Sequence, residues 1–250
     1  MKKKMTILTR FKDNIDSNNL IDKGDTIIVG ASGGPDSQFL ISLLNEIKED
    51  YNLNIILAHL NHLHRKEAID DENLVVETGK KLNLNVRAKR ASMDEFAKEN
   101  KISAEDAGRR LRYDFFRQIA KDFDNAKIAI AHNKDDQAET VLMRLIRGTG
   151  LDGLTGMDFK TDDIIRPILS FEKKEILAYL KENNISYALD QTNFSNDYTR
   201  NYIRNEIIPR MKDINPKVND SIFSLSQLVK NDLEIIDTNI KKISKDTITC

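Results

Sequence analysis

Cysteine is almost missing from this sequence, which has a single one, Cys250, among 250 residues. One thiol cannot form a disulfide within the chain. It also cannot supply the cysteine ligands of a zinc site or an iron–sulfur cluster. The scarcity fits a protein of the reducing cytoplasm, and that is the location we expect.

Long apolar runs are also absent. No run approaches the roughly 20 residues that span a bilayer, so we expect no membrane partner. The basic start, residues 1–10, is not followed by the apolar core of about 7–15 residues that a secretory signal needs. Hydrophobic residues make up 40% and charged residues 32% of the chain, a balance typical of a globular protein.

Neither sign of charge dominates. Lys and Arg number 39 against 40 for Asp and Glu, which gives a net charge of −1. This excludes a uniformly basic nucleic-acid binder and permits a local basic face.

Short apolar runs alternate with segments of helical periodicity. The expected strands are Asp25–Gly30, Asn54–Leu60, Asn85–Lys89, Lys127–Ala131 and Asp163–Ile168, and the expected helices include Phe11–Leu20, Ala68–Leu82, Asp135–Arg147 and Glu172–Asn183. The alternation predicts an α/β fold, an open, doubly wound parallel sheet of Rossmann-like type with helices on both faces. We expect a catalytic domain over 1–212 and a helical extension over 213–250 that leads into a domain absent from this sequence.

Glycines gather where the first strand meets a helix, in the segment SGGPDS. It comprises Ser32, Gly33, Gly34, Pro35, Asp36 and Ser37. Glycines let backbone approach a ligand, and the N–H groups at a helix start bind anions, so the loop is a candidate phosphate site. A carboxylate beside phosphate is unfavourable unless a divalent cation or a nucleophile mediates, which makes Asp36 a candidate Mg²⁺ ligand. The alternative is a plain glycine turn with Ser and Asp as helix caps.

The four histidines fall at the ends of predicted strands, where the ligand crevice of a parallel sheet lies. They are His59, His62, His64 and His132. A zinc site on the first three is conceivable, but such histidines more often bond backbone or phosphate.

Carboxylates open the helix that follows His132. Asp135, Asp136 and Glu139 either stabilise the helix N-terminus or bind a metal or a substrate amine. Their position after a strand favours binding, most of all for Asp136.

Arginines recur beside glycine-rich or loop segments. The candidates for phosphate or nucleic-acid contact are Arg109, Arg112, Arg147, Arg200 and Arg204. The alternative is that these arginines are solvated surface charges without a binding role.

Together these segments resemble the tRNA(Ile)-lysidine synthetase family, a branch of the N-type ATP pyrophosphatases with an adenine nucleotide alpha hydrolase-like fold. The matching pieces are SGGPDS (32–37), Asn61-His62, SAEDAGRRLRY (103–113), AHNKDDQAET (131–140), RGTGLDGLTGM (147–157), Arg166-Pro167, DQTN (190–193) and RNYIR (200–204). Gly108 stands where the family usually has alanine, which costs up to about 1 kcal/mol in a helix.

The resemblance implies a reaction. ATP adenylates the C2 carbonyl of the wobble cytidine of an isoleucine tRNA with anticodon CAU, and the side-chain amine of free lysine then displaces AMP. An amine held by carboxylates must lose a proton before it attacks.

The resemblance also implies roles for the candidates. ATP would be bound by the SGGPDS loop, His59 and His132, and Mg²⁺ by Asp36. The catalytic residues would be Asp36, Arg109, Arg112, Asp136 and Glu139. Lysine would be held by Asp135, Asp136 and Glu139, and tRNA would be contacted by Arg147, Arg200 and Arg204. An oligomer is compatible with the sequence. The rival hypotheses are a tRNA thiolase of the same loop family, a small-molecule adenylating ligase and a nucleotide-sensing module without turnover.

Overall fold

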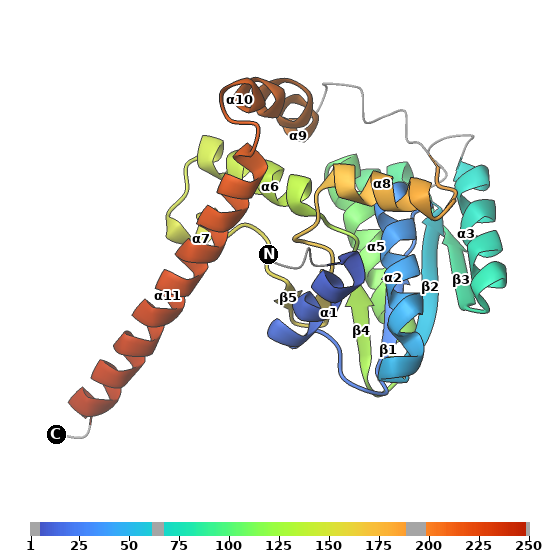
Figure 1. The fold of residues 1–250 in the computed structure, drawn as a ribbon, viewed down its shortest axis with the longest axis horizontal. Helices are drawn as coiled ribbons and strands as arrows, with labels where there is room; N and C mark the ends of the chain where they lie inside the picture. Colours follow the sequence, from blue (N-terminus) through green and yellow to red (C-terminus); the bar gives the residue numbers. More distant parts are fainter. Residues whose placement is uncertain (1–5, 62–67, 189–198, 249–250) are drawn as a thin grey trace. The chain divides into compact units, whose positions relative to one another are not determined.

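The computed structural model describes residues 6–61, 68–188 and 199–248 (Figure 1). The chain forms two compact units, one made of Met1–His132 and Phe159–Asp190 and the other of Asn133–Asp158 and Gln191–Cys250. These units do not test the domain boundary predicted at residue 212, which stays a prediction.

The first unit is built on a six-stranded sheet in the order β3-β2-β1-β4-β6-β5. The strands are β1 (Thr26–Gly30), β2 (Asn54–Asn61), β3 (Asn85–Arg90), β4 (Ala126–Ala129), β5 (Lys160–Thr161) and β6 (Ile164–Ile165). All neighbours are parallel except β5 and β6. The predicted α/β fold is therefore confirmed, with one short antiparallel strand at an edge.

Helices lie on both faces of this sheet, and Figure 1 shows α2 and α5 on opposite sides. The helices of this unit are α1 (Ile7–Ser17), α2 (Pro35–Tyr51), α3 (Ala68–Leu82), α4 (Met93–Asn100), α5 (Ala104–Ala120) and α8 (Lys173–Glu182). Phe116 of α5 packs on Ile28 and Ile56 of the sheet. A Cβ on Gly30 would lie 2.9 Å from the Phe116 ring, so glycine at the end of β1 lets α5 approach.

The second unit is helical. It contains α6 (Lys134–Arg147), α7 (Leu151–Leu154), α9 (Thr199–Tyr202), a π-helical turn η2 (Ile203–Ile207), α10 (Ile208–Ile214) and α11 (Val218–Ile248). Val141 of α6, Ile203 of η2 and Ile222 of α11 share its hydrophobic core. Among the helices that the structure describes, none is long and apolar enough to cross a membrane.

Most expected elements differ from the structure by at most two residues at an end, and two differ by more. The first helix begins at Ile7 rather than Phe11 because the Thr6 side chain accepts a hydrogen bond from the Thr9 N–H and caps it. The strand expected over 163–168 is only Ile164–Ile165, since Pro167 has no N–H to donate to a sheet.

Candidate functional site

The SGGPDS loop connects β1 to α2 with backbone geometry that needs glycine. Gly33 has φ +81°, in the left-handed region, and a Cβ there would lie 3.4 Å from the Asp71 carbonyl oxygen. The Ser32 hydroxyl accepts a hydrogen bond from the Gly34 N–H at 3.3 Å, and the Ser37 hydroxyl donates to the Gly34 carbonyl at 2.9 Å. The loop thus folds back on itself in a small concave turn.

The N-terminus of α2 has no side-chain cap. Gly34 is its N-cap residue and makes no side-chain cap bond, and Pro35 stands in the first turn. The N-cap position itself is glycine, and the capping alternative raised by the sequence stays a hypothesis for Ser32 and Asp36. The helix start keeps backbone donors and a positive dipole end for an anion.

Asp36 lies in the first turn of α2 and forms an ion pair with Lys173. Its carboxylate is 2.6 Å from the Lys173 ammonium, and both side chains are partly exposed. Lys173 was not among the residues predicted from the sequence, because a lysine on an amphipathic helix normally signals only a solvated face. The pair places one cation and one anion beside the loop.

His59 lies within β2, and its ring is buried. Its Nδ1 is 2.8 Å from the Ala31 carbonyl oxygen, so Nδ1 carries the hydrogen and donates. The imidazole therefore ties β2 to the start of the SGGPDS loop. Its Nε2 is buried and has no hydrogen-bond partner among the described residues.

His132 follows β4 and accepts from Arg166. The Arg166 Nε donates to His132 Nδ1 at 3.3 Å, which places the imidazole proton of a neutral His132 on Nε2. Arg166 is buried and also donates to the Thr161 hydroxyl. His62, His64, the segment 190–193 and Cys250 lie outside the described residues, so the zinc alternative is not tested.

The α5 arginines are exposed. Arg109 lies over the Tyr113 ring, with its guanidinium carbon 5.6 Å from the ring centroid. Desolvation of the guanidinium lowers the pKa of Arg112, although the residue as a whole is exposed. The guanidinium stays charged at neutral pH. Arg117 pairs with Asp163 at 3.0 Å.

In the second unit, Asp136 and Glu139 meet Arg200 and Arg204, and we call these four residues the charge cluster. Glu139 is 1% exposed and accepts from Arg200 Nε at 2.7 Å and from Arg204 Nε at 2.6 Å. Asp136 Oδ1 accepts from the two arginines at 3.0 and 3.3 Å. Its Oδ2 accepts from the Asn133 N–H, which completes a capping box. Two carboxylates thus face two guanidinium groups.

Electrostatics favour the charged state of this cluster. Desolvation acts to lower the pKa of Arg200, but attraction to Asp136 and Glu139 outweighs it and raises the pKa above its ordinary value. From the sequence, Asp136 and Glu139 are candidates for an amine or a metal, and Arg200 and Arg204 are separate candidates for tRNA. The structure brings them together.

Asp135 contacts residues outside the charge cluster. Its carboxylate accepts from the Asn219 side-chain amide at 2.8 Å and lies 3.9 Å from the Lys212 ammonium. It therefore has a different environment from Asp136, although the two are adjacent in sequence.

The glycine-rich segment after α6 accepts and donates hydrogen bonds with two α6 side chains. Arg144 donates to the carbonyls of Gly153 and Gly156 at 3.3 and 2.8 Å. Gln137, fully buried, donates to the Thr155 carbonyl and accepts from the Met157 N–H. Arg147 remains exposed at the end of α6.

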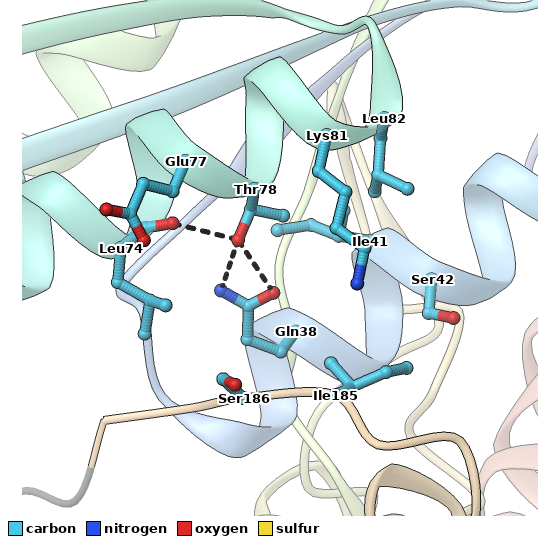
Figure 2. A pocket seen from close by; sticks show the side chains of 10 residues that line it. All are labelled: Gln38, Ile41, Ser42, Leu74, Glu77, Thr78, Lys81, Leu82, Ile185 and Ser186. Atoms are coloured by element: carbon cyan, nitrogen blue, oxygen red, sulfur yellow. Dashed lines mark hydrogen bonds between the residues drawn. The ribbon is translucent and has the colours of Figure 1, made fainter.

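A cavity of about 170 Å³ lies in the first unit between α2 and α3 (Figure 2). Gln38 and Thr78 hydrogen-bond across it, and Ile41 and Leu74 add apolar walls. None of the residues predicted for the site lines this cavity.

A parallel α/β sheet whose first strand runs through a glycine loop into an uncapped helix N-terminus defines a nucleotide-binding domain. The chain belongs to the PP-loop domain family, whose model matches residues 4–211. The family resemblance stated from the motifs is thereby confirmed.

Known relatives make the comparison more specific. The chain is similar to the tRNA(Ile)-lysidine synthase of Thermosipho africanus, with 42% identity over 92% of this chain and 56% of that protein. It is 38% identical to that of Petrotoga mobilis over 92% of this chain and 75% of the other. The chain spans about half the length of several such relatives.

Solved structures share the fold. A U34-tRNA thiolase, NcsA, from Methanococcus maripaludis aligns over 88% of this chain and 78% of its own, with a TM-score of 0.70 and 19% identity. An NH3-dependent NAD synthetase from Campylobacter jejuni covers 90% of this chain and 93% of its own, with a TM-score of 0.50 and 17% identity. At these identities the likeness concerns the fold alone.

Proposed function

We propose that this chain uses ATP to adenylate the C2 carbonyl oxygen of the wobble cytidine in an isoleucine tRNA with anticodon CAU, and then ligates lysine to C2. The uncapped SGGPDS loop carries the proposal, because it offers backbone donors to a triphosphate. The similarity to tRNA(Ile)-lysidine synthases supplies the acceptor and the amine.

The first step is nucleotidyl transfer. The cytosine oxygen attacks the α-phosphorus of ATP, the bond to the β-phosphate oxygen breaks, and pyrophosphate leaves. Gly33, Gly34 and Ser37 would bind the departing phosphates. Arg109 and Arg112 are candidates for the phosphate or the activated nucleotide, because guanidinium groups bind phosphate in a bidentate way.

Asp36 fits a magnesium ion that is shared with substrate phosphates. Mg²⁺ in such sites takes one or two carboxylates and keeps several waters, so a lone Asp36 is sufficient. The described residues contain no group of three acidic, histidine or cysteine side chains that would form a metal cage. The ion would neutralise phosphate charge. The Lys173 ammonium would then release the Asp36 carboxylate and contact a phosphate oxygen instead.

The second step is attack by an amine. The lysine side-chain nitrogen, once deprotonated, bonds to C2, and AMP leaves with the former carbonyl oxygen. The charge cluster is suited to this exchange, because Arg200 and Arg204 can turn toward a phosphate while Asp136 and Glu139 hold an ammonium. Asp135 is a further candidate for the amine, and Arg147, exposed on α6, for tRNA phosphates.

The test is pyrophosphate release with ATP, Mg²⁺, lysine and an unmodified tRNA transcript bearing CAU. Release that requires the tRNA supports adenylation of tRNA. Release without tRNA, or transfer of sulfur from a thiol donor to the tRNA in place of lysine, would contradict the proposal. Lys173→Met should raise the KM for ATP, and Lys174→Met is the matched control, since Lys174 pairs with Glu172 and is mostly exposed.

A further inference from the structure

The helix that carries Arg200 and Arg204 contains an irregular turn. Thr199–Tyr202 is α-helical, Ile203–Ile207 forms the π-helical turn, and the α-helix resumes at Ile208. The Ile208 N–H donates to the Ile203 carbonyl, five residues earlier, where an α-helix would bond four residues earlier. The turn therefore holds one extra residue.

Pro209 provides a cause for this turn. A proline inside a helix has no N–H to donate, and its ring clashes with the carbonyl four residues earlier, here that of Asn205. Ile207 and Ile208, which precede Pro209, have helical backbone, so an uninterrupted α-helix at this point would meet the clash. A wider turn moves the carbonyl out of the way of the ring.

The extra residue changes which side chains share a face. Ile203 and Ile208 both belong to the hydrophobic core of the second unit. In an uninterrupted α-helix, residues five apart lie roughly 140° apart around the axis. Widening the turn brings both isoleucines onto the core.

The same rotation determines on which side of the helix Arg200 and Arg204 lie. Arg200 and Arg204 are four residues apart, and both reach Glu139. If Ile208 and Met211 kept their packing and the turn became α-helical, the segment before it would rotate by about 100°. Arg204 would then leave Glu139.

We propose that Pro209 is a positioning residue, which holds the extra residue in the Ile203–Ile207 turn and thereby directs Arg200 and Arg204 onto Glu139. The proposal rests on the proposed function, because the charge cluster that Pro209 positions is the one assigned there to lysine ligation. Its structural part does not depend on which reaction the cluster serves.

Three variants test it: Pro209→Ala, deletion of Glu206, and the two combined. The deletion removes the extra residue, and the ion pair that Glu206 makes with Arg210, at 3.7 Å, is exposed. Double-mutant cycles between Arg204 and Glu139 measure whether the pair is intact in each background, with no reference to activity. Lysine incorporation into tRNA is measured alongside.

We expect each single change to abolish the Arg204–Glu139 coupling and to slow lysine incorporation at least about tenfold. The combined variant should recover both, because an ordinary α-turn of four residues restores the phase and no proline opposes it. Pro216→Ala, in the turn after α10, is the control and should behave as wild type.

Intact coupling in Pro209→Ala would overturn the proposal, since the proline would not be needed for the register. A combined variant with no more coupling than the single variants, or one that does not fold, would overturn it too. If wild type incorporates no lysine but the coupling follows the expected pattern, the proposed function fails and the positioning role stands.

Discussion

Removing the charge of Glu139 is the most informative perturbation of the charge cluster. Glu139 is 1% exposed, whereas the Arg200 and Arg204 side chains are 29% and 36% exposed. Glu139→Gln keeps the shape of the side chain and leaves two guanidinium groups beside a neutral amide. Breaking a fully buried pair costs about 3–5 kcal/mol, while exposed pairs contribute about 0–1 kcal/mol.

We expect a loss of about 2 kcal/mol in the free energy of unfolding, between these limits, because water screens the arginines but not the carboxylate. For a chain of this size that corresponds to a fall in Tm of roughly 4–8 °C. Thermal and denaturant unfolding measure it. Glu206→Gln makes the same chemical change at an exposed pair of the second unit and should shift the free energy by less than about 0.5 kcal/mol.

Equal effects of Glu139→Gln and Glu206→Gln would refute this reasoning, since burial would then not matter. Wild-type stability in Glu139→Gln with lost activity would show that the cluster is purely functional.

Three further predictions follow from other parts of the molecule. Asp36→Asn should abolish pyrophosphate release and leave the Tm within about 2 °C of wild type, because its pair with Lys173 is partly exposed; release at the wild-type rate would remove the metal role. Arg112→Ala should weaken tRNA binding and flatten the dependence of log K on log salt by about one unit, as filter binding at several salt concentrations would measure. Hydrogen bonds from Arg90 and Asn61 hold the pKa of Glu72 below its ordinary value of 4.5, so the stabilisation over Glu72→Gln should be constant above about pH 5 and decline as the pH falls further. A stability difference that grows on acidification would contradict it.

The sequence predicts the sheet and the SGGPDS loop well, because both depend on local signals. Buried apolar runs mark β1 and β2, and glycines beside a strand end mark a turn with positive φ. The capping of α1 by Thr6 is local too, but a single threonine in a basic segment is a weak signal.

The charge cluster could not be predicted from local patterns. Glu139 and Arg200 are 61 residues apart, and their meeting depends on how α6 and the helix of α9 and η2 pack together. The role of Lys173 beside Asp36 has the same origin, since 137 residues separate them. Pro209 is visible in the sequence, yet its effect on Arg204 depends on Ile203 and Ile208 sharing one core.

The most direct test of the central claim is the product itself. The chain is incubated with radiolabelled lysine, ATP, Mg²⁺ and tRNA bearing CAU, beside a tRNA with a different wobble base and beside the Cys250→Ser variant. We predict lysine in the CAU tRNA alone, with one AMP and one pyrophosphate formed per lysine, and full activity in Cys250→Ser because ligation needs no thiol. Sulfur incorporation instead of lysine, or loss of activity in Cys250→Ser, would contradict the account and favour thiolation.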